Sequence, residues 1–130
     1  MPPRPVRPAI HKFGGASLAD AAAIRRAVQI ILSQRGPLVI VASALAGITD
    51  LLLGLVTAAE RGDIASLETG VGAFRRRHRE VAESLLPAKA SREMATAIEA
   101  AGDELDALVR ALAVLREASP RVSDHVISRG

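Results

Sequence analysis

The chain has 130 residues, of which 49% are apolar and 24% are charged, with a formal net charge of +3. This composition fits one compact domain or most of one, and the absence of cysteine excludes disulfides and thiolate metal sites. The net charge is small and there are only two aromatic residues, so the composition does not indicate nucleic-acid binding. No apolar run is long enough to cross a membrane. We therefore expect neither a nucleic acid nor a membrane as a partner.

The first third of the chain predicts alternating strands and helices. Four prolines in residues 1–8 indicate a disordered or extended arm. Residues 9–13 then have the pattern of a short strand, and Asp20 is placed to cap a helix with apolar residues at helical spacing. Residues 38–42 form a β-branched apolar run, typical of a strand covered on both faces. Strand, helix and strand in this order predict a βαβ unit with parallel strands.

The remainder of the chain is predicted to be helical. Residues 48–60 have the pattern of an apolar helix, and residues 64–86 and 91–117 carry amphipathic stripes. Because a short turn joins the two long helices, we expect them to pack as an antiparallel hairpin. Ser119-Pro120 predicts the start of a last helix that runs to the final glycine. Two strands are too few for an independent sheet, so we expect residues absent here to complete it.

A candidate phosphate site follows the first strand. Lys12 brings a cation, and Gly14 and Gly15 leave backbone N–H groups without a neighbouring Cβ. Ser17 adds a hydroxyl near the start of the next helix, where anions are favoured. On these residues alone, a solvated strand end followed by a plain turn explains the pattern equally well. The spacing matches neither of the common glycine-rich nucleotide motifs.

A second group of hydroxyls follows the second strand. Ser43 ends that strand and Thr49 comes six residues later, and both hydroxyls could bind a substrate carboxylate. Taken alone, Thr49 is better interpreted as a cap for the helix that begins near Asp50. Ligands of open parallel sheets bind at the carboxyl ends of the strands. We therefore expect the two groups of polar residues at the same edge of the sheet.

Other polar residues have simpler interpretations. The run from Arg75 to Arg79 lies inside an amphipathic pattern, so it is interpreted as a solvated helix face. The histidines at positions 11, 78 and 125 lack the spacing of metal ligands. We therefore expect no metal-binding residue in the chain.

Three segments together resemble the aspartate kinases of the amino-acid kinase superfamily. They are Lys12-Phe13-Gly14-Gly15-Ala16-Ser17, Ala42 to Asp50, and Ile127-Ser128-Arg129-Gly130, in the family's order and spacing. The resemblance covers residues 9–130. It implies an α/β fold with three α/β/α layers and a helical hairpin, here incomplete, in which residues 9–130 form the N-terminal part of a kinase domain.

The resemblance also implies a reaction, in which the γ-phosphate of ATP passes to the β-carboxylate of L-aspartate. This is the first step of lysine, threonine and methionine biosynthesis, in the cytoplasm. By position, the residues that would contact the ATP phosphates are Lys12, Phe13, Gly14, Gly15 and Ser17, with Lys12 as the catalytic cation, and those near aspartate are Ser43 and Thr49. Mg²⁺ would be held mainly through the nucleotide phosphates, and the full-length protein is expected to be a homo-oligomer.

The sequence also departs from the family pattern. Ala16 stands where the family often has threonine, and in the family a glutamate and the rest of the kinase domain follow the glycine that matches Gly130. The chain is therefore expected to be a fragment without kinase activity of its own. Its parent is either an aspartate kinase alone or a bifunctional protein that also carries homoserine dehydrogenase.

Two alternatives stay open. One is another amino-acid kinase such as an acetylglutamate kinase, against which the spacing of Ser43 and Thr49 argues. The other is a non-catalytic helical interaction module.

Overall fold

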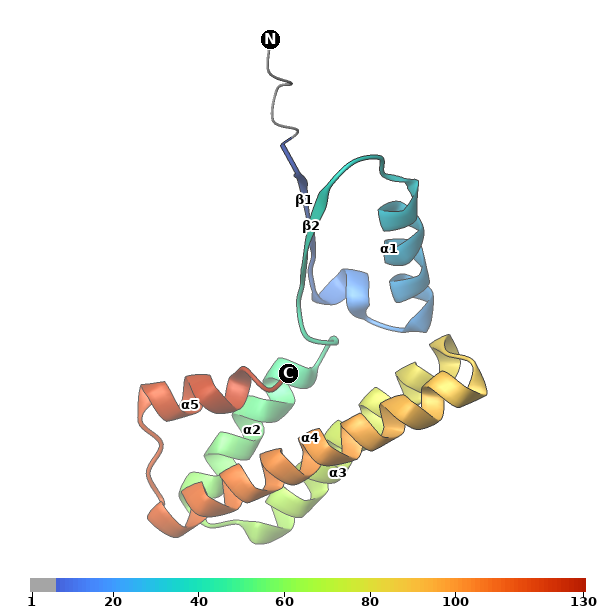
Figure 1. Ribbon diagram of the computed structural model, residues 1–130. Helices are drawn as coiled ribbons and strands as arrows, with labels where there is room; N and C mark the ends of the chain where they lie inside the picture. The colour runs from blue at the N-terminus through green and yellow to red at the C-terminus, as the bar shows by residue number, and fades with distance from the viewer. Residues whose placement is uncertain (1–6) are drawn as a thin grey trace. The chain divides into compact units, whose positions relative to one another are not determined.

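The computed structural model describes residues 7–130. Its internal contacts divide the chain into two compact units, unit 1 (Met1–Ala46) and unit 2 (Gly47–Gly130), and Figure 1 shows both. Most of the arm predicted over residues 1–8 lies outside the described residues; Arg7 and Pro8 have no regular structure.

Unit 1 is a βαβ unit, as the sequence predicts. Its elements are β1 (Ala9–Phe13), the 3₁₀ turn η1 (Gly15–Leu18), α1 (Ala21–Ser33) and β2 (Leu38–Ala42). The strands pair in parallel, with Ala9 opposite Leu38 and Phe13 opposite Ala42. The predicted cap of α1 is confirmed, because Oδ1 of Asp20 accepts a hydrogen bond from the N–H of Ala23 at 2.7 Å. The short η1 turn was not predicted.

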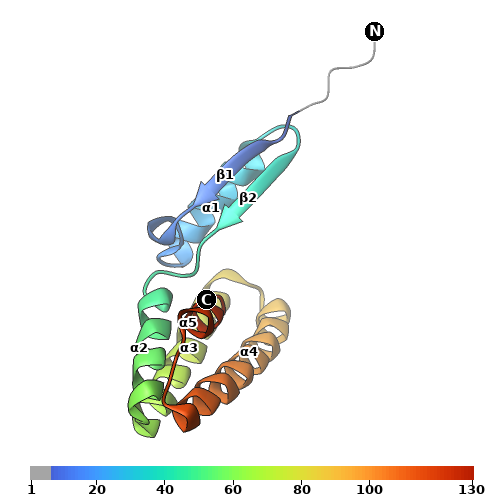
Figure 2. The same ribbon diagram turned by 90° about the vertical axis from the view of Figure 1, so that its left-hand side faces the viewer.

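Helix α1 lies along one face of the two-stranded sheet (Figures 1 and 2). Phe13 points to that face, because it is 7% exposed and lines a cavity together with Ala23 and Ala27 of α1. Successive side chains of a strand alternate between faces, so the opposite face carries Ile10, Lys12, Val39 and Val41. The prediction that β2 is covered on both faces is wrong for this chain, since no described element of unit 1 covers the second face and β2 remains largely exposed.

Unit 2 consists of four helices around one apolar core. They are α2 (Ile48–Arg61), α3 (Ile64–Leu85), α4 (Ala88–Leu115) and α5 (Pro120–Ile127). Helices α3 and α4 form the predicted antiparallel hairpin, with α2 packed against both (Figure 1). The fully buried side chains include Leu52, Leu67, Leu105 and Val109. Helix α4 begins three residues before its predicted start, and α5 ends before the last glycine.

The arginine run on α3 is only partly a solvated face. Arg75 pairs with Glu99 of α4, with Nε at 3.2 Å from Oε2, and with Asp103. Arg79 also reaches Glu99, at 2.6 Å. Gly102 makes this possible, because a Cβ added there would lie 2.7 Å from Cγ of Arg75. The prediction of a purely solvated face is therefore wrong for Arg75, whose side chain is 22% exposed.

Candidate functional site

The two strands of unit 1 end side by side, and the residues that follow them lie together. The N–H of Ser43 donates to the carbonyl of Phe13 at 2.9 Å. A Cβ built on Gly15 would lie 3.9 Å from the Ser43 hydroxyl oxygen, which is ordinary contact distance. The loop after β1 thus lies beside the first residue after β2. The expectation that both polar groups share one edge of the sheet is confirmed for Ser43.

Lys12 lies one residue before the end of β1, on the face of the sheet that α1 does not cover. Its side chain is exposed. Within residues 7–130, no carboxylate forms an ion pair with it. The ammonium group is therefore available to an external anion beside the loop that starts at Gly14.

The two glycines of this loop leave its backbone open. Gly14 has a φ of −82° and a ψ of 179°, an extended conformation that any residue adopts. Its carbonyl accepts a hydrogen bond from the N–H of Ser17 at 2.9 Å, which closes η1. A Cβ added to Gly14 would meet no atom within 4 Å. The backbone conformation does not demand glycine at position 14, so the open space beside the loop is the feature that suits a phosphate.

Two hydroxyls flank the loop. Ser17 is exposed and lies in η1, before the first turn of α1. The hydroxyl of Ser43 donates to the carbonyl of Ala44 at 2.7 Å and keeps its lone pairs. Because Ser43 is exposed, its hydroxyl can turn toward a ligand. A phosphate contact by Phe13 stays a prediction; its side chain is part of the core and its carbonyl already bonds to Ser43.

Thr49 belongs to unit 2, where it is the second residue of α2. Gly47 occupies the N-cap position with a φ of 82°, and no side chain caps this helix end. The prediction that Thr49 caps α2 is therefore wrong. The left-handed conformation of Gly47 lets the helix start at Ile48, which places Thr49 inside the first turn. Its exposed hydroxyl is free of a capping bond, and its role toward a substrate stays a prediction.

Arg26 was not among the predicted site residues. This residue lines the same cavity as Ser17 and Phe13, a hollow of about 300 Å³ between η1 and α1. The helical period places Arg26 on the same side of α1 as Ala23 and Ala27, which also line the cavity. This helical spacing was the one feature of the sequence that could have pointed to Arg26. It places a second cation, Arg26, next to the loop that follows β1.

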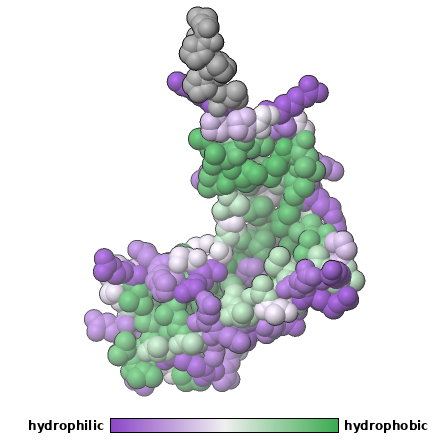
Figure 3. All heavy atoms as spheres, viewed as in Figure 1, coloured by the Kyte–Doolittle hydropathy of each residue, from purple (hydrophilic) through white to green (hydrophobic). Residues whose placement is uncertain are grey.

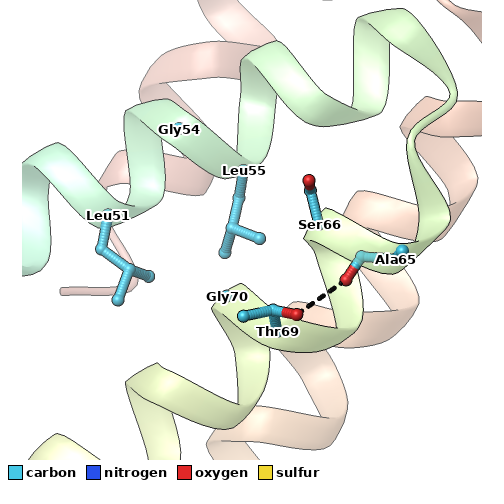
Figure 4. A pocket seen from close by; sticks show the side chains of 7 residues that line it. All are labelled: Leu51, Gly54, Leu55, Ala65, Ser66, Thr69 and Gly70. Carbon is cyan, nitrogen blue, oxygen red and sulfur yellow. Dashed lines mark hydrogen bonds between the residues drawn. The ribbon is translucent and has the colours of Figure 1, made fainter.

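A larger hollow of about 420 Å³ lies in unit 2, between α2 and α3 (Figure 4). Its lining is Leu51, Gly54, Leu55, Ala65, Ser66, Thr69 and Gly70. The Thr69 hydroxyl already donates to the carbonyl of Ala65 at 2.9 Å. No charged side chain lines this hollow, so it offers no complement to a phosphate or a carboxylate.

Residues 7–130 bring together no cluster of three or more acidic or histidine side chains that could hold a metal ion. None of the helices in this part of the chain has the length and apolar character of a membrane span.

Comparison with known proteins identifies aspartokinases as relatives. No protein-family model matches the chain. It is 32% identical over 126 residues to lysine-sensitive aspartokinase 3 of Escherichia coli K12, a match that covers 93% of this chain and 25% of the relative. It is 29% identical over 131 residues to a chloroplastic bifunctional aspartokinase/homoserine dehydrogenase of Daucus carota, covering 98% of this chain and 14% of that protein.

Solved structures agree with the sequence comparison. The crystal structure of E. coli aspartokinase III in complex with aspartate and ADP matches with a TM-score of 0.81 and 31% identity, over 95% of this chain and 26% of that one. The complex of the same enzyme with lysine and aspartate gives a TM-score of 0.73. The chain thus spans about a quarter of the E. coli protein's length. Aspartokinases are homologues of this chain, and the predicted incomplete α/β fold is confirmed.

Proposed function

We propose that this homologue of the aspartokinases provides the phosphate-binding and aspartate-binding part of an aspartate kinase. The observation that carries the proposal is that the Gly15 loop and Ser43 lie next to each other at the ends of the two paired strands, and that Lys12, with no ion pair among the described residues, lies in the same strand end. Relatives named as aspartokinases, one of them crystallised with aspartate and ADP, support it. The whole protein would transfer the γ-phosphate of ATP to the β-carboxylate of L-aspartate.

The chemistry of this transfer fits the groups present. A carboxylate oxygen of aspartate attacks the γ-phosphorus, the bond from that phosphorus to the bridging oxygen breaks, and ADP leaves with the electron pair. No general base is needed, because the carboxyl group of aspartate is already ionised near neutral pH. Catalysis then rests on positioning and charge stabilisation. Lys12 would neutralise charge on the transferring group, and the amides at Gly14 and Gly15 would donate to its oxygens.

The hydroxyls would position the second substrate. Ser43 would exchange its bond to the Ala44 carbonyl for a bond to a carboxylate of aspartate. Thr49 would add a second hydroxyl from the first turn of α2, where the helix dipole favours an anion.

Mg²⁺ would neutralise the phosphate oxygens when bound with ATP. The described residues include no cluster of acidic or histidine ligands, so this part of the protein does not fit a metal site of its own. In the proposal the nucleotide phosphates hold the ion, and Lys12 acts on the same phosphates.

The test is an assay of the complete translation product of the reading frame that contains this sequence. With MgATP and L-aspartate, aspartyl phosphate is trapped by hydroxylamine and measured as the coloured hydroxamate. We expect Lys12→Ala to lower kcat by about 10²–10³-fold, as removal of one charge-stabilising donor does. Lys89→Ala, at the other lysine, which is exposed on α4, is the matched control and should leave kcat unchanged.

Other outcomes would support the alternatives. Turnover of acetylglutamate in place of aspartate would assign the protein to another amino-acid kinase. No turnover, with no effect of nucleotide on the thermal midpoint, would favour an interaction module, in which the long helical hairpin of α3 and α4 would offer the binding surface. Residues 1–130 alone are expected to show no turnover.

A further inference from the structure

The end of α5 packs beside the beginning of α2. The two helices are in direct contact, and Val126 of α5 and Ile48 of α2 are buried, at 0% and 1% exposure. Figures 1 and 2 show the C-terminal end of α5 next to the first turn of α2. That first turn contains Thr49, which is exposed. The turn after α5, residues 128–130, therefore lies on the side of unit 2 where Thr49 is presented.

Arg129 connects this turn to α4. Its Nη1 donates to Oε2 of Glu104 at 2.8 Å, and its Nη2 lies 3.3 Å from Nε2 of His125, one helical turn earlier. The main chain adds a hydrogen bond from the N–H of Arg129 to the carbonyl of Val126, at 3.1 Å. The main chain thus attaches the turn to α5, and the arginine side chain attaches it to α4.

Helix α5 is short and has little core of its own. It has eight residues, and isolated helices of this length are marginal in water. Of these eight, all within the described part of the chain, Val126 alone is buried. Figure 3 shows hydrophilic residues gathered over α5. One buried valine holds the helix at one point, so the ion pair of Glu104 with Arg129 adds a second point, at the turn itself.

We propose that Glu104 is a positioning residue for the aspartate end of the proposed site. Through its ion pair with Arg129, it holds the turn after α5 beside the first turn of α2, where the proposed function places a carboxylate of aspartate near Thr49. Glu104 lies on α4 and acts only through Arg129. The inference rests on the proposed function, since without an aspartate site there is nothing for the turn to position.

The ion pair also sets the charge of this side of unit 2. A guanidinium without a partner would be a strong ligand for a carboxylate of aspartate, because arginine can donate two parallel hydrogen bonds to it. Arg129 already donates to Glu104, and the two charges offset each other. Arg129 therefore serves the site by holding the turn and not by binding the substrate. The two roles predict opposite changes when the carboxylate at position 104 is removed.

The experiment measures the KM for L-aspartate and for ATP in the complete translation product, with the hydroxamate assay. We expect Glu104→Gln to raise the KM for aspartate about two- to fivefold and to leave kcat and the KM for ATP within about twofold, because loosening the turn weakens aspartate binding alone. A fivefold change equals about 1 kcal/mol, the upper range for an exposed ion pair.

The matched control is Glu68→Gln. It removes the ion pair of Glu68 with Arg110, which joins α3 to α4, and the Glu68 side chain has the same 64% exposure as that of Glu104. We expect both variants to lower the thermal midpoint by the same small amount, as followed by circular dichroism, and only Glu104→Gln to raise the KM for aspartate. A loss of stability alone therefore cannot produce the expected difference.

A double-mutant cycle tests whether Glu104 acts through Arg129. Arg129→Gln should raise the KM for aspartate by the same factor as Glu104→Gln, and the double variant should raise it no further. Arg129→Lys keeps a cation opposite Glu104 and should give a lower KM than Arg129→Gln. Additive effects of the two glutamine substitutions would show that Glu104 does not act through Arg129 and would overturn the inference.

Three further results would also overturn it. The first is a KM for aspartate that Glu104→Gln leaves unchanged. The second is a KM that Glu104→Gln lowers, because the released guanidinium would then bind the substrate. The third is an equal rise in KM from Glu104→Gln and Glu68→Gln. No turnover by the unchanged protein would refute the proposed function and this inference with it, whereas turnover with an unaltered KM in Glu104→Gln would refute this inference alone.

Discussion

Replacing Gly102 by alanine tests how the hairpin of unit 2 is built. Gly102 is a buried residue of α4, and a Cβ there would lie 2.7 Å from Cγ of Arg75 and closer still to its Nε. The substitution therefore has two opposing effects. Alanine favours the helix over glycine, whereas the added methyl group displaces the arginine that joins α3 to α4.

The magnitudes indicate that the cost of displacing Arg75 exceeds the gain in helix propensity. Glycine to alanine inside a helix gains about 0.5–1 kcal/mol. The displaced Arg75 loses its ion pairs with Glu99 and Asp103, whose side chains are 48% and 77% exposed, so each pair contributes only about 0.2–1 kcal/mol. Overpacking adds about 1–3 kcal/mol. We expect Gly102→Ala to lower the free energy of unfolding by about 1–2 kcal/mol.

A second substitution reverses the sign. The Arg75→Ala background lacks the three atoms that lie nearest to a Cβ at position 102, so the same Gly102→Ala change should stabilise the chain there by about 0.5–1 kcal/mol. Urea unfolding followed by helical circular dichroism measures all four chains of this double-mutant cycle. If Gly102→Ala stabilises both backgrounds equally, the close approach of Arg75 to Gly102 is not what fixes the hairpin.

Two further predictions concern unit 2. Leu105→Ala should cost about 2–5 kcal/mol in urea unfolding, because Leu105 is 0% exposed, and a loss below 1 kcal/mol would contradict its place in the core. The hydroxyl and then the N–H of Ser66, at 2.6 and 3.1 Å, hold the pKa of Asp63 below its ordinary value of 3.8. A lowered carboxyl pKa gives stability that is present above pH 3.8 and lost as the pH falls through the folded-state value. Ser66→Ala should raise that pKa toward 3.8, as followed by carboxyl ¹³C NMR, and an unchanged titration would refute the assignment.

Features encoded by neighbouring residues were predictable from the sequence. The caps at Asp20 and Ser119, the two strands and the hairpin are each set by residues within a few positions of one another, and all are observed. The grouping of Gly15 with Ser43 followed from a general property of parallel sheets, so that part of the site could be predicted without any contact information.

The features that were missed depend on distant residues or on backbone conformation. Arg75 turns inward because Gly102, far along the chain, leaves room for it. Thr49 loses its capping role because Gly47 adopts a positive φ, which the sequence alone does not fix. The exposure of β2 depends on what lies against its second face, and a strand's own residues carry no information on whether that cover is present.

The hairpin of α3 and α4 is longer than α2, the helix that packs against it. Helix α4 has 28 residues and α2 has 14, so at 1.5 Å per residue they are about 42 and 21 Å long. Equal insertions into both arms at the turn around Pro87 would lengthen the hairpin and leave the remaining contacts in place. We therefore expect evolution to have varied the length of this chain most freely at that turn, and hardly at all between Gly14 and Ser17, where one inserted residue would move every donor of the loop.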